Sequence, residues 1–433
     1  MDVLRSAAGS WNELTTVTFG GVQAMFFRHP AVNREPASRA GFSGKLRISW
    51  GLLFFLLVAL AVVVVVFRET EANPASPLTS DFEVFYYASH MLTDGARHAL
   101  YDLSAQHVFQ ARFARPHAGL FYYPAAVLVP YLLLCWLPLL PAFAAWTALQ
   151  LALLVADVRL LARFAGVDHG DWPILLALAF APTASSLILG QTSILILTLY
   201  VAVYALWRRG WRWAGGVVLG LATLKFQLIA GFVVVLLLRR KWREFGGACL
   251  GAAVIAVVSV LLTGVRALAA YPSLVRFGDN GFSSIPDKMA CWRGLISLSG
   301  GHHLGWVVWL SALTIGWAAW TWTSLDVGFS VALLASMLVS FHFNPQDLCL
   351  FLIPFFLIRR ARLLPGGWLS AAAFGAVLVS LLAGRITGAL LTIPLAAMLV
   401  AVGWAGRSRQ SEAAAAGRIP ATWGAAILGD VEY

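Results

Sequence analysis

Long apolar runs, separated by short polar segments, follow one another along most of the 433 residues of this chain. The first uninterrupted run covers residues 50–67, and the later ones begin at residue 124. They lie at about 124–140, 141–157, 173–189, 192–207, 213–238, 245–263, 304–324, 326–341, 346–358, 368–384 and 387–405. Because roughly 20 apolar residues suffice for one helical passage through a bilayer, the pattern predicts an all-α, polytopic transmembrane bundle of about 12 spans over residues 49–405.

Two polar segments interrupt the pattern for longer than a turn requires. Residues 68–117 hold six acids, four arginines and four of the nine histidines, yet Phe82, Phe85 and Tyr86 recur at the spacing of one helix face. We predict a structured external loop here, with two amphipathic helices lying at the membrane interface. Residues 264–303 form a second, later external loop.

Composition excludes a soluble fold. Apolar residues make up 60% of the chain and charged residues only 12%, whereas an ordinary soluble domain carries about 25% charged residues. The net charge of +11 comes from clustered Lys and Arg, and such clusters at span ends mark the cytoplasmic side of a membrane protein. We therefore predict a membrane partner and no nucleic-acid binding.

The basic clusters at 239–243 and 359–362 set the expected topology. If both are cytoplasmic, the basic tail of residues 1–48 and the tail of residues 406–433 are cytoplasmic too. Both long loops and the turn at 342–347 then lie outside.

A third basic cluster conflicts with this topology. Arg208, Arg209 and Arg212 precede the 239–243 cluster by one apolar run, so both clusters cannot be cytoplasmic if residues 213–238 cross once. A hairpin that breaks near Lys225 would reconcile them, but it would leave 13 crossings and spoil the parity of the termini. We keep about 12 spans.

Cysteine and histidine usage offers no metal or disulfide framework. The four cysteines form no CxxC pair, and three of them lie in apolar runs. The turn from Ser340 to Asp347 contains a single His, so zinc ligation is not expected there. The N-terminus lacks the pattern of a cleavable signal.

Asp81 is the first candidate for chemistry. It lies shortly after the first span and opens the segment Asp81-Phe82-Glu83-Val84-Phe85. A carboxylate near a low-dielectric interface is suited to deprotonating a sugar hydroxyl. A helix N-cap is the competing interpretation, because Ser and Asp commonly begin apolar helices.

Lys225 is the only ionisable residue well inside an apolar run. Burying its charge costs a few kcal/mol on insertion scales, so it requires a partner or an aqueous cavity. A phosphate anion is one natural partner, and snorkelling to the interface is the alternative.

Further polar and aromatic residues stand at span boundaries. Each has a plain structural interpretation beside the functional one: a turn for Gln191, an interfacial aromatic belt for the tyrosines, and a solvated loop for Arg293. His342 belongs to a polar group at a span boundary, which usually lines a cavity. The candidate substrate-binding residues are Tyr86, Tyr87, Tyr122, Gln191, Lys225, Arg293 and His342.

An ordered set of motifs resembles glycosyltransferase family 87, the polyprenyl-phosphate-mannose-dependent transferases of the GT-C superfamily. The set comprises Asp81-x-x-x-Phe85-Tyr86-Tyr87-Ala88, Leu100-Tyr101-Asp102, Tyr122-Tyr123-Pro124, Gly190-Gln191-Thr192-Ser193, the segment from Gly216 to Lys225, Arg239-Arg240-Lys241-Trp242 and His342.

This resemblance implies inverting transfer of a hexose, with mannose favoured, from a polyprenyl-phosphate donor to a lipid or glycan acceptor. It implies no cofactor and no metal, and it puts the active site on the external or periplasmic face of a multi-pass cell (inner) membrane protein. Asp81 then matches the catalytic base, His342 a late active-site histidine, and Lys225 the lysine of the glycine-rich span. Two other classes stay open, a transporter or flippase for lipids or glycolipids and a non-catalytic assembly subunit.

Overall fold

The computed structural model describes residues 49–72, 81–113, 119–167, 170–277, 286–300, 304–363 and 388–415. Within these ranges every regular element is a helix and no strand occurs, which confirms the predicted all-helical class. The predicted N-terminal tail lies outside the described residues, as does the apolar run at 368–384.

The first half of the chain contains three long helices joined by shorter elements. The bounds are α2 (Trp50–Ala72), α3 (Asp81–Thr93), η1 (Arg97–Ala99), α4 (Leu103–Gln110), η2 (Ala125–Leu128), α5 (Val129–Leu132), α6 (Leu139–Ala165), α7 (Trp172–Ala179), α8 (Ala181–Leu189), α9 (Ser193–Arg208), α10 (Arg212–Leu221), η3 (Ala222–Leu228), α11 (Ala230–Leu238) and α12 (Trp242–Thr263), where η marks a 3₁₀ segment.

The second half continues with elements of similar kinds. They are α13 (Val265–Phe277), η5 (Pro286–Lys288), α14 (Trp292–Ser297), α15 (Leu304–Trp320), α16 (Leu325–Val339), η6 (Pro345–Phe351), α17 (Leu352–Arg360), η7 (Gly388–Leu391) and α19 (Thr392–Ala415). Helix α19 extends past residue 405, where the last apolar run was expected to end.

Four of these helices are long and apolar enough to cross a membrane: α2, α6, α12 and the continuous η7–α19. The pair α7 and α8, bent by 68° against each other, makes a fifth if it counts as one span. The protein is therefore a helical membrane protein in its described part, with four or five candidate spans. The predicted count of 12 is not confirmed.

The predicted span at 124–140 is wrong. The structure has two four-residue elements there, η2 and α5, and a single 27-residue helix, α6, that begins at Leu139 and takes up the next predicted run. Pro124, Pro130 and Pro138 explain the interruption, because proline removes a backbone donor and ends or restarts a helix. Tyr131 is fully buried against the protein.

The predicted single span at 213–238 is also wrong, because these residues form a hairpin. Its arms, α10 and α11, meet at η3, where Lys225 leaves the helical conformation with φ −128° and ψ 67°. The break near Lys225 is thus the alternative that reconciles the basic clusters.

The packing of α10 on α12 shows why the chain turns back. Both helices carry glycines at the GxxxG spacing, Gly216 with Gly220 and Gly247 with Gly251, and this motif lets helix backbones approach closely. A Cβ at Gly220 would lie 2.2 Å from the carbonyl oxygen of Ala248. The contacts advance in the same direction along both helices, so α10 and α12 are parallel. Helix α11, which connects them in sequence, must therefore run in the opposite direction.

Arginines from distant segments gather at one end of the bundle, which we call the basic end. Arg360 of α17 pairs with Asp326 of α16 at 2.9 Å and also donates to the carbonyl of Phe164. The Arg208 guanidinium lies 4.7 Å from the Phe164 ring centroid, and Arg409 donates to the carbonyl of Ala361. Arg212 meets Glu244 at 3.6 Å, so the 208–212 and 239–243 clusters share this end.

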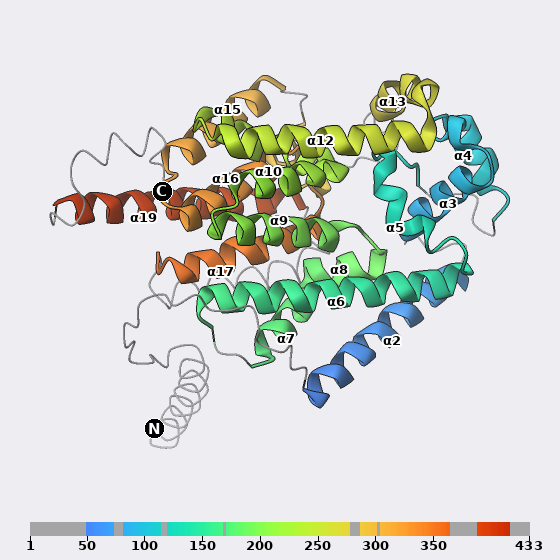
Figure 1. The fold of residues 1–433 in the computed structure, drawn as a ribbon, viewed down its shortest axis with the longest axis horizontal. Helices are drawn as coiled ribbons and strands as arrows, with labels where there is room; N and C mark the ends of the chain where they lie inside the picture. The colour runs from blue at the N-terminus through green and yellow to red at the C-terminus, as the bar shows by residue number, and fades with distance from the viewer. Residues whose placement is uncertain are drawn as a thin grey trace, which may run out of the picture. The chain divides into compact units, whose positions relative to one another are not determined.

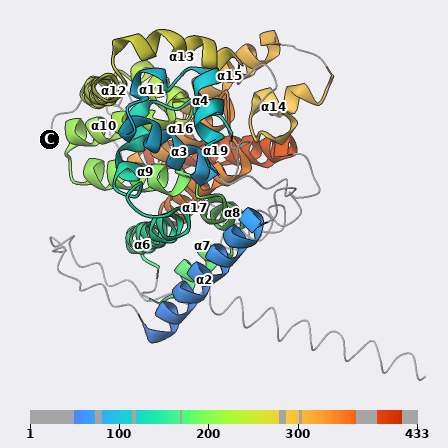
Figure 2. The same ribbon diagram turned by 90° about the vertical axis from the view of Figure 1, so that its right-hand side faces the viewer.

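The loop segments α3, α4 and α13 gather at the opposite end, which we call the loop end. In Figure 1 they lie together on the right, and Figure 2 looks onto them. His98 contacts the carbonyl of Thr263 at 2.9 Å, and the Tyr271 hydroxyl donates to the carbonyl of Tyr122 at 3.0 Å. Residues 81–113 thus fold onto the far ends of the helices.

Three helical hairpins start and finish at the basic end. The first is α7–α8 with α9, the second is α10 with α11, and the third is α16 with η6–α17. The basic-end anchors are Asp171 with Arg159 at 2.7 Å for the first hairpin, and Asp326 with Arg360 for the third. We call residues 190–193, 222–229 and 340–347 the hairpin tips.

Candidate active site

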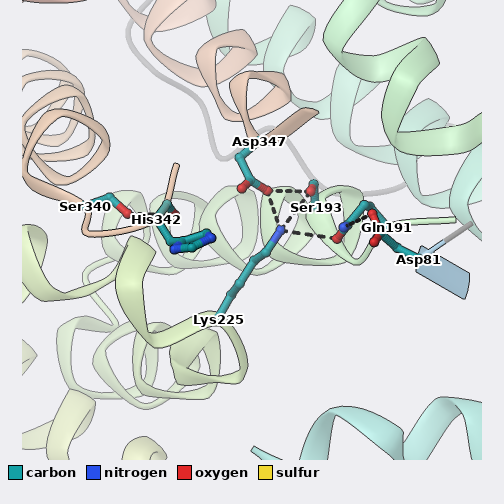
Figure 3. Close-up of polar contacts among 7 residues, drawn as sticks. All are labelled: Asp81, Gln191, Ser193, Lys225, Ser340, His342 and Asp347. Atoms are coloured by element: carbon teal, nitrogen blue, oxygen red, sulfur yellow. Dashed lines mark hydrogen bonds and ion pairs between the residues drawn. The ribbon is translucent and has the colours of Figure 1, made fainter. Parts of the chain in front are cut away.

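The three hairpin tips bring three polar side chains into contact with Lys225. The Lys225 ammonium forms an ion pair with Oδ1 of Asp347 and donates to Ser193 Oγ at 3.1 Å. It also donates to Gln191 Oε1 at 3.4 Å. Ser193 Oγ donates to the same Asp347 oxygen at 2.6 Å, so each tip supplies part of one network (Figure 3).

This network is buried. Lys225 and Asp347 are each 1% exposed, which rules out the snorkelling interpretation of Lys225 because its charge does not reach an interface. Removing two ions from water costs several kcal/mol per ion, and their attraction returns it only when further hydrogen bonds help. Ser193 and Gln191 supply such bonds. In the described part of the chain, Asp347 Oδ2 has no hydrogen-bond partner.

Asp81 joins the network through Gln191. Its carboxylate accepts a hydrogen bond from Gln191 Nε2, while Gln191 Oε1 faces Lys225. Figure 3 shows Gln191 between the two charged groups. Asp81 is the first residue of α3, as the N-cap interpretation predicted for a helix start. It also makes the polar contact that the functional interpretation predicted, so both features occur at this residue.

Gly190 allows α3 to come this close. Its φ of +65° ends α8 in the left-handed conformation that favours glycine. A Cβ at this position would also lie 2.6 Å from Cβ of Phe82. The residue after Asp81 therefore packs on the residue before Gln191, which fixes the register of the Asp81–Gln191 hydrogen bond.

Burial raises the pKa of Asp81 to about 6. The Gln191 hydrogen bond and the Lys225 charge oppose this rise, and the nearby Asp347 charge adds to it. Tyr123 and Tyr131 also interact electrostatically with the Asp81 carboxylate, and Tyr123 does so with Asp347 as well. A carboxylate with a pKa just below neutral pH is ionised at working pH and still basic enough to accept a proton.

Three of the predicted residues form a second group beside the third hairpin tip. The Arg293 guanidinium lies 3.9 Å from the ring centroid of Phe341, and its Nη1 donates to the Phe341 carbonyl at 3.4 Å. The ring of His342, the next residue, lies 6.4 Å from that of Tyr122. Arg293 thus contacts the residue before His342, and the His342 ring lies near that of Tyr122.

Tyr86 and Tyr87 have structural contacts elsewhere. The Tyr86 hydroxyl donates to the carbonyl of Leu137 at 2.8 Å, and Tyr87 stacks on Phe113 with 4.4 Å between ring centroids. Both tyrosines are buried. These contacts hold α3 against the segments that contain Leu137 and Phe113.

Asp347, Ser193, Tyr123 and Tyr131 are site residues that the predicted substrate-binding set does not contain, although all except Tyr131 lie in segments noted in the sequence. Asp347 had a usable signal: a buried lysine requires an acid, and Asp347 stands at the start of another apolar run. The aromatic cluster before Pro124 was noticed, but the spacing did not distinguish Tyr123 from Tyr122.

In the described ranges, no three His, Cys, Asp or Glu side chains come together in a group that could hold a metal ion. Among those residues the four cysteines are free. The expectation that no metal or cofactor takes part stays a prediction.

Comparison with known proteins identifies a family. The model of Glycosyltransferase family 87 matches residues 121–345, which is more than half of the chain. The match contains Gln191, Lys225, Arg293 and His342, and it ends just before Asp347. Searches of curated proteins and of solved structures returned no match.

Proposed function

This chain belongs to glycosyltransferase family 87 and is a membrane glycosyltransferase, and from this we propose that it uses a polyprenyl-phosphate donor. In the proposed reaction a hexose, with mannose favoured, passes to a lipid or glycan acceptor with inversion. The reaction takes place at the loop end, on the external face of the cell (inner) membrane.

The observation that supports this function best is the Asp81 carboxylate. It is held by Gln191, and its pKa of about 6 suits a general base. In the proposed step Asp81 accepts the proton of an acceptor hydroxyl while that oxygen attacks the anomeric carbon from the face opposite the phosphate. The bond from the anomeric carbon to the phosphate oxygen breaks, and polyprenyl phosphate leaves with the electron pair. A single displacement of this kind inverts the anomeric centre.

We assign the departing phosphate to the second group, with Arg293 as its cation and His342 and Tyr122 beside it. Arg293 lies against Phe341 at the third hairpin tip, and guanidinium groups recognise phosphate oxygens well. Lys225 was the other candidate, but its charge is balanced by Asp347. Tyr86 and Tyr87 support the position of Asp81 on α3.

The proposed orientation follows from the basic end. Arginines from several segments share that end, and the bias of Lys and Arg assigns it to the cytoplasm. We retain 12 apolar passages, but they are not the same 12 segments as those expected from the sequence. They are α2, α6, α12, α15, α19, the six arms of the three hairpins and the run at 368–384. Several arms are short, since the ten residues of α10 rise only about 15 Å.

Cysteine labelling tests this orientation. Ser104→Cys at the loop end and Ala361→Cys at the basic end are introduced separately into a cysteine-free background. In intact cells, an impermeant maleimide is expected to label position 104 and not position 361. The reverse pattern would put Asp81 in the cytoplasm and contradict transfer on the external face.

A transporter or flippase is the second candidate, and one feature favours it. Broken helices with a charged group near mid-depth are typical of secondary transporters, and both the α7–α8 bend of 68° and the break at Lys225 fit that description. Family membership supports the enzyme instead.

A donor comparison in proteoliposomes separates the two candidates. The purified protein is given radiolabelled polyprenyl-phosphate mannose or the corresponding nucleotide sugar, together with a membrane lipid extract as acceptor. We expect labelled product from the lipid donor alone. Transfer from the nucleotide sugar alone would refute the donor class, and movement of the lipid donor between leaflets without any transfer would favour the flippase.

A further inference from the structure

We propose that Asp347, Lys225 and Gln191 form a positioning relay for Asp81, in which the lysine charge serves the protein's own base and not the donor phosphate. The relay runs from the third hairpin tip to the second, then to the first, and ends on α3. It rests on the proposed function, because it assigns a role within that reaction to three residues that do not touch the reacting atoms.

The first argument is the direction of the hydrogen bonds. A lysine ammonium can only donate and an ionised carboxylate can only accept, whereas a glutamine amide does one on each side. Lys225 therefore fixes Gln191 Oε1 toward itself and leaves Nε2 directed at Asp81. In this arrangement one orientation of the Gln191 amide satisfies both neighbours, so Lys225 sets the geometry of the base without touching it.

The second argument is the charge balance. Asp81 and Asp347 carry two negative charges around the single positive charge of Lys225, so the three ionised groups sum to −1. A phosphate brought to Lys225 would meet this negative surplus inside a low-dielectric region, where like charges repel strongly. Arg293 lies outside the relay, against Phe341, and is better placed for an anion.

The third argument is the free-energy cost of burying the Lys225–Asp347 ion pair. Replacing a buried ion pair by apolar side chains is often neutral or stabilising, so stability alone does not account for Lys225 and Asp347. The backbone of η3 departs from helical geometry at Lys225, and such a break gives up helical hydrogen bonds within an apolar segment. A role in positioning the base explains why these features occur together.

The relay also sets the ionisation of Asp81. The charged groups that act on this carboxylate are Lys225 from η3 and Asp347 from η6. Two titratable groups, Tyr123 and Tyr131 from the segment between α4 and α6, also face it, and the Asp81 charge raises their pKa values. Of these groups Lys225 is the one cation, and Gln191 adds a hydrogen bond to the ionised form. Loss of either interaction disfavours the charged carboxylate, so protonation of Asp81 moves to higher pH.

The test compares two variants that break the relay at different places. Gln191→Leu removes the link and leaves the Lys225–Asp347 pair intact, so it keeps the test open if the lysine variant does not fold. Lys225→Met is made together with Asp347→Asn, so that no buried charge is left unpaired. Gln110→Leu is the matched control, because Gln110 is also a buried glutamine at the loop end. Among the described residues its side chain bonds locally, to the carbonyl of Gly119 at 3.1 Å.

Two readouts are needed. The infrared carboxyl band that disappears in Asp81→Asn reports protonation of Asp81 without any need for activity. Its midpoint is expected to rise by about one pH unit in Gln191→Leu and to stay unchanged in Gln110→Leu. In the transfer assay, loss of the relay lowers kcat even at pH 8, because the base is no longer oriented, and the shift lowers it about fivefold further at pH 6. KM for polyprenyl-phosphate mannose changes less than twofold.

Three outcomes would overturn the relay. They are an unchanged Asp81 midpoint in both relay variants, a tenfold or larger rise in donor KM with kcat preserved, and an equal shift in the Gln110→Leu control. If no variant and no wild-type protein transfers sugar, the proposed function fails, but the infrared midpoints still decide whether the relay controls Asp81.

Discussion

Among the ion pairs in the described part of the chain, one at the basic end and one at the hairpin tips differ sharply in their surroundings. At the basic end, Arg360 and Asp326 pair at 2.9 Å with side chains that are 34% and 21% exposed. At the hairpin tips, Lys225 and Asp347 pair with side chains that are 2% and 1% exposed. The Arg360–Asp326 pair is partly exposed to solvent, whereas the Lys225–Asp347 pair is buried.

The difference indicates what each pair is for. The basic-end pair has alternatives close by, since Asp326 also accepts from the Tyr204 hydroxyl and Arg360 also donates to Phe164. Partly exposed pairs of this kind contribute about 0–1 kcal/mol to stability, so this pair is a weak structural contact between helix ends. The tip pair bears a desolvation penalty that a purely structural contact does not require, and it connects through Gln191 to Asp81.

The largest expected effect is on stability. Asp347→Asn leaves Lys225 buried with only the more distant Asp81 as a counter-charge, and breaking a buried pair this way costs about 3–5 kcal/mol. Asp326→Asn is the matched change at the basic end and should cost less than about 1 kcal/mol. Thermal unfolding of both variants in detergent measures the difference. Equal losses would mean that burial does not distinguish the two pairs.

The second effect concerns the donor. Arg293→Gln removes the cation assigned to the phosphate, and losing a charged hydrogen bond typically costs about 1.5–3 kcal/mol. KM for polyprenyl-phosphate mannose should therefore rise about tenfold or more. Arg360→Gln at the basic end should change it less than twofold. A normal KM in Arg293→Gln would move the phosphate to another cation.

The smallest effect is the pH dependence of the wild-type protein. A base must be deprotonated to act, and burial raises the pKa of Asp81 to about 6. The transfer rate should therefore be constant above about pH 7 and fall to half near pH 6 as Asp81 is protonated. The Asp326→Asn variant should keep the same midpoint. A midpoint near pH 4 would mean that Asp81 is not desolvated.

Much of the fold was predictable because a bilayer imposes a simple rule on apolar length. The helical class and the two ends followed from apolar runs and basic clusters. The residues that make up each span could not be predicted in the same way, because the length of an apolar run does not show whether the helix breaks within it. Pro124, Pro130 and Pro138 interrupt one predicted span, and the paired GxxxG motifs turn another into a hairpin. The first error removes one crossing and the second adds one, so the total number of crossings is unchanged. The expected side of the membrane for each end of the bundle is therefore unchanged too.

The site was predictable only in part. Asp81, Gln191 and Lys225 were selected, and the structure joins them in one network. Asp347 was not selected, because it lies 122 residues from Lys225 and no spacing rule links residues on different hairpins. Tyr86 and Tyr87 were selected because they belong to the motif that begins at Asp81. Residues of one helix point in different directions, however, and both tyrosines pack elsewhere.

The most direct test of the account is the transfer rate of Asp81→Asn, measured with radiolabelled polyprenyl-phosphate mannose beside Asp326→Asn. Asparagine keeps the shape of the side chain and its contact with Gln191 but cannot accept the acceptor's proton. Loss of a general base lowers rates about 10²–10⁴-fold, so Asp81→Asn should fall by that factor while Asp326→Asn stays within threefold of wild type. An Asp81→Asn rate within threefold of wild type would contradict the assignment of the base and, with it, the role of the hairpin tips.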